Sequence, residues 1–202
     1  MNITTVIYDF GQVLIGWDPR RVWRRRMSES EIDAFVEEID FARRNHALDE
    51  GRPFAQVLAE VARDAPGHAP LLEEYWNSFA DSLTGPIPGS YDLAHRLHTN
   101  GYRLLGLTNW SAETFHHALA AAPAVSLMEG TIVSGEVGIA KPDPAIFHHL
   151  LDTFSVRPQE AVFIDDTPAN IAAAREIGIN AIHFRGVEEL TEDLVRLGVR
   201  CS

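Results

Sequence analysis

The sequence predicts an α/β fold in which a doubly wound parallel sheet carries an inserted α-helical cap. Two observations lead to this prediction. Short apolar runs typical of buried strands alternate with segments of helical period along most of the 202 residues. Residues 16–86 interrupt that alternation with helical patterns and no convincing strand. Strands that alternate with helices form right-handed βαβ units, and repeated units of this kind build a parallel sheet.

The strands of the predicted sheet are short runs rich in β-branched and aromatic residues. They are expected at residues 3–9, 103–109, 161–166 and 180–184. Each of the last three follows a segment with helical period. Gly101 and Gly178 are expected to end two of these helices, and Asp143 and Pro144 to begin the third as its N-cap and first residue. These runs therefore define the strands and crossover helices of a parallel sheet.

The interrupting segment is expected to form the helical cap. Its predicted helices lie at residues 28–39, 53–62 and 70–83. The first begins with Ser28 and Glu31, a capping-box pair that satisfies free N–H groups of the first turn. The stretch TGPIPG at residues 84–89 indicates a hinge back into the sheet. We therefore predict two domains, a core of residues 1–15 and 87–202 and a cap of residues 16–86.

The composition excludes several classes of protein. The formal net charge of −12 opposes binding to nucleic acids and anionic lipids. No apolar run approaches the roughly 20 residues that span a bilayer, and the first residues lack the features of a signal peptide. The single cysteine, Cys201, excludes an internal disulfide and a cysteine-rich metal site. We expect a cytoplasmic protein that binds neither nucleic acid nor membranes, and the sequence leaves its oligomeric state open.

One basic patch stands out against this acidic background, the run RRVWRRR at residues 20–26. As a helix, the run would bury Val22, Trp23 and Met27 and leave its arginines in solvent. The alternative is a role for these arginines in recognition of an anionic substrate.

Polar residues follow the predicted strands at the points where these strands end. Asp9 ends the first strand, Thr108 and Asn109 end the second, and Asp165 and Asp166 end the third. In a parallel α/β sheet, ligands bind outside the carboxyl ends of the strands. We therefore expect these side chains to converge on one crevice.

This set of groups fits the chemistry of phosphoryl transfer. Clustered carboxylates repel one another unless a cation lies between them, and oxygen ligands suit Mg²⁺. Lys141, in the loop AKPDP before a predicted helix, adds a positive charge, and the Thr108 hydroxyl adds a donor. A cation, a lysine and hydrogen-bond donors together form a site for a phosphate dianion. A carboxylate held there can attack phosphorus to give an aspartyl-phosphate, and Asp9 is the natural candidate.

The stretches YDFGQVL, LTNW, AKPDP and FIDD, in this order, resemble the four motifs of the haloacid dehalogenase-like hydrolase superfamily. The resemblance spans nearly the whole chain and implies a Rossmann-like core with an inserted helical cap. It also implies that Asp9 is the nucleophile. The implied ligands of Mg²⁺ are Asp9, the carbonyl of Gly11, Asp165 and Asp166. Thr108 and Lys141, which the resemblance also implies to be catalytic, would hold the phosphoryl oxygens, and Asn109 would border them as a further substrate-binding residue.

Gly11 departs from the pattern of many phosphatases in this superfamily. These enzymes carry a second aspartate two residues after the nucleophile, which protonates the leaving alcohol and then activates water. General acid–base help of this kind is worth about 10²–10⁴ in rate. Three explanations are open: another acid replaces it, the leaving group needs little protonation, or the protein binds a phosphoester and turns it over poorly. The candidate replacements within reach are Asp18, His46, Asp49 and Glu50.

The leading hypothesis is a Mg²⁺-dependent phosphatase that acts on a small phosphorylated metabolite. The first motif, D-x-G-x-V at residues 9–13, resembles that of a subgroup containing sugar-1-phosphate phosphatases, which favours a sugar phosphate. The alternative is a non-catalytic or weakly active protein that binds a phosphometabolite, and Gly11 is the feature that supports it. A 2-haloacid dehalogenase is disfavoured, because such an enzyme needs no metal and the pair Asp165 and Asp166 would repel its substrate.

Overall fold

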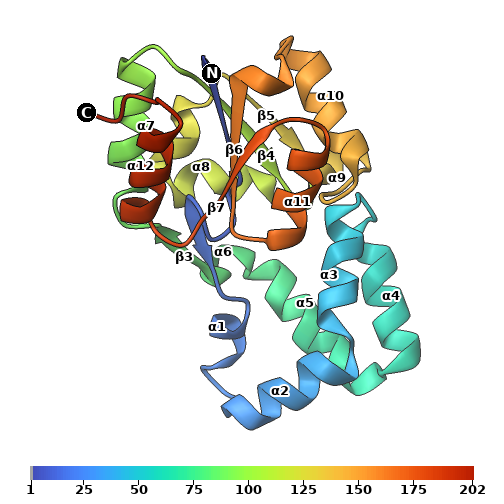
Figure 1. Cartoon of the computed structure of the whole chain (residues 1–202). Coiled ribbons are helices and arrows are strands. Elements are labelled where there is room, and N and C mark those ends of the chain that lie inside the picture. The colour runs from blue at the N-terminus through green and yellow to red at the C-terminus, as the bar shows by residue number, and fades with distance from the viewer. Residues whose placement is uncertain (1) are drawn as a thin grey trace.

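The computed structural model describes residues 2–202, and its centre is a five-stranded sheet (Figure 1). The strands lie in the order β5-β4-β1-β6-β7, and all neighbours run parallel. Their bounds are Thr5–Tyr8 for β1, Arg103–Thr108 for β4, Gly130–Val133 for β5, Ala161–Asp165 for β6 and Asn180–His183 for β7. Each of the four predicted runs contains one of these strands, so the α/β class with a parallel sheet is confirmed.

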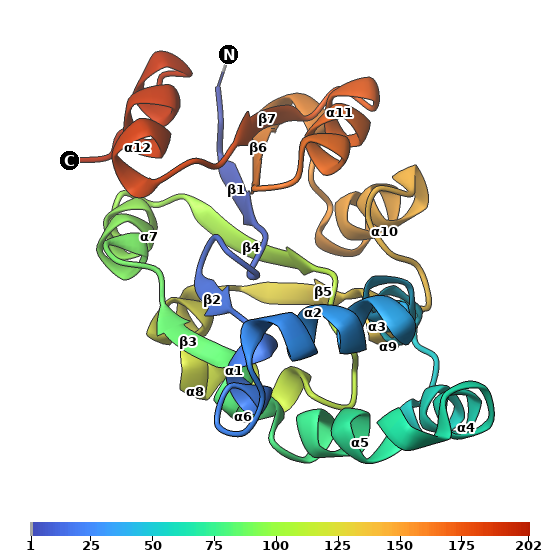
Figure 2. The same ribbon diagram turned by 90° about the horizontal axis from the view of Figure 1, so that it is seen from below.

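Helices cover both faces of this sheet (Figure 2). Their bounds are Ser90–Thr99 for α7, Ala118–Ala121 for α8, Ser134–Val137 for α9, Pro144–Phe154 for α10, Pro168–Glu176 for α11 and Val187–Arg196 for α12. Successive side chains of a strand point to opposite faces. In β1, Val6 belongs to the apolar cluster that includes α7 and α12, and Ile7 to the cluster that includes α10 and α11. No helix within residues 2–202 has the length and apolar character needed to cross a membrane.

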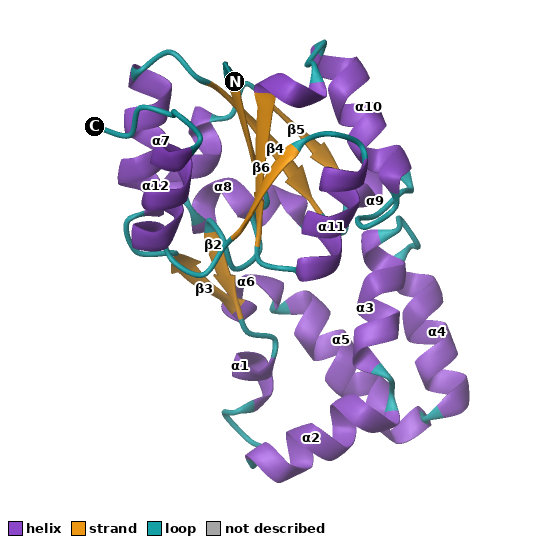
Figure 3. Ribbon diagram, viewed as in Figure 1, coloured by secondary structure: helices purple, strands orange, loops and turns teal. Residues whose placement is uncertain are grey.

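A second group of helices lies below the sheet in the view of Figures 1 and 3. Their bounds are Arg20–Trp23 for α1, Glu29–Glu38 for α2, Phe41–Asp49 for α3, Phe54–Asp64 for α4, Ala69–Asn77 for α5 and Phe79–Ser82 for α6. The capping box of Ser28 and Glu31 begins α2 as predicted. The ring of Trp23 lies 4.9 Å from that of Phe35 and 5.4 Å from that of Tyr75, which joins α1, α2 and α5. The limits of this group as a separate domain stay a prediction.

The prediction that residues 16–86 contain no strand was wrong. Ile15–Trp17 (β2) and Leu83–Pro86 (β3) pair as a two-stranded antiparallel sheet at the two ends of the helical segment. Both strands are short and both contain glycine, and each pairs with a strand that the whole helical segment separates from it in the sequence. No local pattern therefore indicates them. The helix predicted at 70–83 is likewise divided at Ser78 into α5 and α6. Helices α3, α8, α9 and α12 and strand β5 were not predicted.

The basic run at residues 20–26 forms α1 and the turn that follows it. Val22 and Trp23 are buried, as the helical interpretation predicts. Four of the five arginines pair with acidic side chains, and Arg24 contacts both Asp18 and Glu29, whereas Arg21 donates to the carbonyl of Leu83 at 3.2 Å. None of these arginines lines the cavity described below.

Candidate functional site

The three central strands end side by side, and each places a predicted site residue at its end. Asp9 directly follows β1, and its N–H donates to the carbonyl of Ile164 in β6 at 2.9 Å. Thr108 is the last residue of β4 and Asp165 the last of β6. Because β1 pairs in parallel with both of these strands, the three ends meet at one edge of the sheet. The predicted convergence of polar side chains is therefore confirmed.

Lys141 lies at the centre of this convergence. Its Nζ donates to Asp9 Oδ1 at 2.8 Å, to Asp165 Oδ2 at 2.7 Å and to the carbonyl of Leu107 at 2.9 Å. The side chain is almost fully buried, so three protein acceptors engage the three ammonium hydrogens. Burial acts to lower the pKa of Lys141, but the charges of Asp9 and Asp165 outweigh it and raise the pKa above its usual value. Lys141 is thus a fixed cation between two carboxylates.

The adjacent acids Asp165 and Asp166 have different surroundings. Asp165 is fully buried, and besides Lys141 it accepts the N–H of Thr167 at 2.7 Å and the amide of Asn170 at 3.0 Å from each oxygen. Asp166 is only half-buried, and the hydroxyl of Thr167 lies 3.5 Å from its Oδ1. Asp165 is therefore held in place by the protein, whereas the carboxylate of Asp166 is open to a ligand. Sequence reasoning missed Asn170, whose signal is its place in the first turn of α11 after the acid pair.

Asp9, Asp165 and Asp166 form a group that could hold a metal ion. One carboxylate oxygen from each lies within 4.8 Å of the other two. Burial raises the pKa of Asp9 to about 7, although the charge of Lys141 opposes this effect. Burial and the charge of Asp165 also raise the pKa of Asp166. Lys141 alone therefore does not balance the three acids, and a divalent cation among them would do so.

Thr108 and Asn109 use their side chains differently. The Thr108 hydroxyl is buried and has no hydrogen-bond partner among the described residues. Asn109 is engaged by the main chain of Lys141, because its Oδ1 accepts the Lys141 N–H and its Nδ2 donates to the Lys141 carbonyl, both at 2.8 Å. An unpaired buried hydroxyl is costly, so Thr108 fits a group that donates to a ligand. Asn109 fits a group that fixes the loop carrying Lys141.

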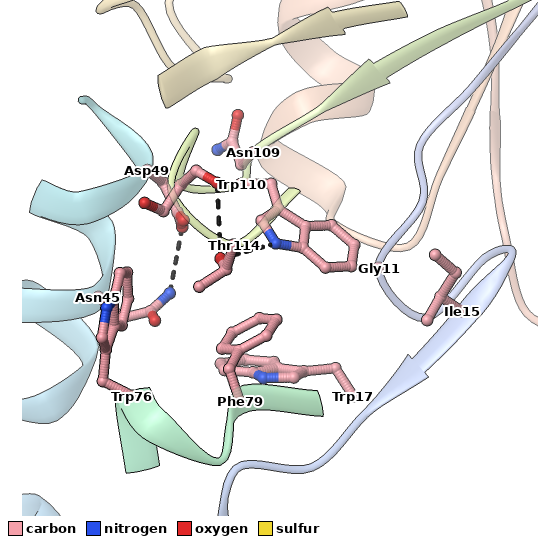
Figure 4. A pocket seen from close by; sticks show the side chains of 11 residues that line it. Gly11, Ile15, Trp17, Asn45, Asp49, Trp76, Phe79, Asn109, Trp110 and Thr114 are labelled. Atoms are coloured by element: carbon pink, nitrogen blue, oxygen red, sulfur yellow. Dashed lines mark hydrogen bonds between the residues drawn. The ribbon is translucent and has the colours of Figure 1, made fainter. Parts of the chain in front are cut away.

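A cavity of about 100 Å³ lies beside these residues, between the sheet edge and the helical segment (Figure 4). Gly11 and Asn109 line it from the core, and Asp49 and Asn45 line it from α3. The remaining walls are largely aromatic and include Trp17, Trp76, Phe79 and Trp110. The cavity is smaller than the roughly 300–1,000 Å³ of pockets that hold drug-sized ligands, so in this form it suits a small molecule.

Gly11 has room for a larger side chain. A Cβ built there would meet no heavy atom within 4 Å, and its backbone φ does not require glycine. We therefore expect Gly11→Asp to change the free energy of unfolding by less than about 1 kcal/mol in thermal denaturation. The control is Gly106→Ala, whose Cβ would lie 2.8 Å from ring atoms of the buried Phe10. That variant should lose about 1–3 kcal/mol through overpacking, and equal losses in both variants would contradict the geometry around Gly11.

Curated relatives resemble this chain over part of their own length. A drimenol cyclase, drtB, from Aspergillus calidoustus is 32% identical over 208 residues, which cover 96% of this chain and 36% of that protein. A phosphoserine phosphatase from Thermus thermophilus is 32% identical over 133 residues, which cover 65% of this chain and 52% of that protein. This chain thus corresponds to about a third to a half of these relatives.

A solved structure shows the same fold, and a sequence model shows the family. A HAD family enzyme from Bacteroides thetaiotaomicron, solved in complex with magnesium and inorganic phosphate, superposes with a TM-score of 0.68 at 21% identity. That match covers 92% of this chain and 96% of the solved one. The sequence model of the haloacid dehalogenase-like hydrolases matches residues 4–178, which include the four motif regions at the sheet edge. The chain therefore belongs to the family of haloacid dehalogenase-like hydrolases.

Proposed function

We propose that this hydrolase is a Mg²⁺-dependent phosphatase that cleaves a small phosphomonoester through a phosphorylated Asp9. The observation that carries the proposal is the convergence of three carboxylates, the buried cation of Lys141 and the unpaired hydroxyl of Thr108 at one edge of the sheet. Mg²⁺ and phosphate in the related solved enzyme, and the phosphatase among the curated relatives, support the same reaction class.

The residues at the sheet edge fit a magnesium site. We assign the carboxylates of Asp9 and Asp166 and the carbonyl of Gly11 as its protein ligands, since oxygen atoms are the ligands that Mg²⁺ prefers. Asp165 contributes charge and holds Lys141, because its oxygens already accept protein donors. When bound, Mg²⁺ would offset the negative charge of the carboxylates and of the phosphoryl group.

The contacts of Asp9 indicate how it would react. Its Oδ1 accepts the N–H of Phe10 at 2.7 Å and the ammonium of Lys141 at 2.8 Å, and no donor among the described residues contacts Oδ2. A free Asp9 oxygen attacks phosphorus, and the bond from phosphorus to the ester oxygen breaks. Water then attacks the same phosphorus, which releases phosphate and restores the carboxylate. Thr108 would donate to a phosphoryl oxygen during both steps, and the positive charge of Lys141 would offset the negative charge that develops there.

The cavity supports a proposal for the substrate class. Its small volume and aromatic walls suit a compact organic group, and Asn45 and Asp49 offer polar contacts to hydroxyl groups. A sugar phosphate fits this description and agrees with the first motif. The second candidate function, binding of a phosphometabolite with little turnover, is favoured by one feature, the absence of an acid at Gly11.

A metal-dependence experiment tests the proposal. We expect the purified chain to release phosphate from members of a panel of phosphomonoesters with Mg²⁺ and to lose this activity with a chelator. A second measurement does not depend on turnover: Mg²⁺ at about a hundredfold excess over its Kd should stabilise the fold by about 2–3 kcal/mol. Asp166→Asn should abolish that stabilisation, whereas Asp143→Asn, at the N-cap of α10, should keep it. Binding of panel members without phosphate release would favour the second candidate.

A further inference from the structure

Asp49 is the ionisable residue that the helical segment contributes to the cavity (Figure 4). It is the last residue of α3, and the other residues that line the cavity are neutral. Gly11, at the position where related phosphatases carry an acid, lines the same cavity. The cavity therefore holds one carboxyl group, which reaches it from the helical segment and not from the first motif.

The end of α3 is fixed against the core. Gly51 follows α3 with a φ of +89°, and a Cβ built there would lie 2.9 Å from the carbonyl oxygen of Gly135 in α9. The two main chains therefore approach closely, and only glycine fits this position. Three residues after Gly51 the chain enters α4, where the N–H of Phe54 donates to Glu113 of the core at 3.0 Å. Asp49 is thus held at a defined place relative to the sheet edge.

The surroundings of Asp49 suit a group that gives up and takes back a proton. Asn45 donates to its Oδ2 at 3.1 Å, and the main-chain N–H of Ser111 is a second donor, which acts to lower the pKa of Asp49. Burial raises the pKa of Asp49 to about 7, the charge of Lys141 opposes this, and the charges of Asp9 and Glu50 add to it. An acid–base group is most effective when its pKa lies near the working pH.

The other candidates within reach have different partners. Asp18 forms an ion pair with Arg24 and accepts the N–H of Arg20 at 3.1 Å. His46 and Glu50 lie 3.4 Å from each other on the exposed side of α3. None of these three lines the cavity. Asp49 is therefore the candidate that the structure supports.

We propose that Asp49 supplies the general acid and base that Gly11 lacks, an inference that rests on the proposed phosphatase activity. In the first step the bond from Asp9 to phosphorus forms, the ester bond breaks, and the carboxyl proton of Asp49 passes to the leaving oxygen. In the second step the Asp49 carboxylate takes a proton from water as the water oxygen attacks phosphorus. The bond from phosphorus to Asp9 breaks, phosphate leaves, and Asp49 is protonated for the next turnover.

Asp49→Asn separates the two steps when two aryl phosphates are compared. Phenolate is a much poorer leaving group than p-nitrophenolate, so it depends more on the acid. In this variant we expect the rate of phosphorylation by phenyl phosphate to fall by about 100-fold or more, and the rate with p-nitrophenyl phosphate to fall by less than about 10-fold. The rate at which the phosphorylated chain decays should fall by about 100-fold. Rapid mixing followed by intact-mass measurement reports both rates. Asp152→Asn, the same chemical change at an exposed position of α10 outside the cavity, should match the original chain.

Restoring an acid at position 11 gives the complementary test. Gly11→Asp combined with Asp49→Asn should regain at least about tenfold in the decay rate of the phosphorylated chain, whereas Gly11→Asp alone should gain nothing. Equal slowing with both aryl phosphates, or a change in KM alone, would overturn the proposal and leave Asp49 as a substrate-binding residue. Asp49→Ala provides the same comparison should the asparagine variant fail to fold. Turnover that survives Asp9→Asn would instead refute the proposed phosphatase mechanism, so the two failures are distinguishable.

Discussion

Asp9→Asn should lower kcat for every phosphomonoester that the chain hydrolyses by at least about 10⁴-fold. An amide oxygen is a far weaker nucleophile than a carboxylate, and the variant forms no aspartyl-phosphate. Asparagine keeps the shape of the side chain and its oxygen can still accept from Phe10 and Lys141. The loss would therefore fall on the chemical step and not on the fold. Steady-state release of phosphate measures it.

The same substitution should leave the protein at least as stable as before. Burial raises the pKa of Asp9 to about 7, which means that the folded chain disfavours the charged form of this residue. A neutral side chain avoids that cost above this pH, so the melting temperature in chelator should not fall. Asp143→Asn makes the same chemical change at an exposed N-cap and should keep full activity. Retained turnover in Asp9→Asn, or lost turnover in Asp143→Asn, would contradict the role assigned to Asp9.

Local sequence patterns predicted the elements whose signals lie within a few residues. The buried strands β1, β4, β6 and β7 are apolar runs, and a parallel sheet buries such runs on both faces. Strand β5 has four residues, one of which is glycine, so its pairing with β4 decides its structure. Strands β2 and β3 likewise depend on a partner far along the chain. Pairing between distant segments is the information that a local pattern lacks.

The sequence predicted which residues form the candidate site, but it did not predict the different contacts that each of them makes. Asp165 and Asp166 are adjacent, and nothing in the sequence distinguishes them. In the structure, Lys141 and Asn170 hold the carboxylate of Asp165, whereas the carboxylate of Asp166 is open to a ligand. Asn109 was predicted to border the phosphoryl group, and the structure adds that its amide binds the main chain of Lys141. Asp49 was one of several acids within reach. Its distinction depends on where α3 ends relative to the sheet, which is a tertiary feature.

Lys141→Met should lower the free energy of unfolding by about 3–5 kcal/mol in the presence of chelator. The substitution preserves the length of the buried stem but removes the cation between Asp9 and Asp165, which leaves two buried carboxylates without their shared partner. For a chain of this size, the loss corresponds to a fall in melting temperature of roughly 10 °C. Arg157→Met removes a cation from an exposed pair with Glu160 and should change stability by less than about 0.5 kcal/mol.

The loss of stability in Lys141→Met should become larger as the pH rises. Without Lys141 the pKa of Asp9 must rise further, because the cation is the largest influence that lowers it. A carboxyl group whose pKa is higher in the folded than in the unfolded chain loses stability as the pH rises through the folded pKa. The difference between Lys141→Met and the original chain should therefore be larger at about pH 8 than at about pH 5.5. A pH-independent difference would indicate lost packing and not an uncompensated charge.

A double variant isolates the electrostatic cause. If Lys141→Met is unstable because of the charge left on Asp9, the added substitution Asp9→Asn removes that charge. We expect the double variant to recover about 1–3 kcal/mol of stability. A coupling of this size is expected for residues in contact, as Asp9 and Lys141 are. Asp143→Asn in the Lys141→Met chain should recover nothing, since its side chain caps α10 and forms no pair with the lysine. Denaturant unfolding at about pH 8 measures all of these variants on one scale. Recovery would show that the nucleophile and the buried lysine stabilise each other, so that the charge needed for catalysis is costly to keep without a cation beside it.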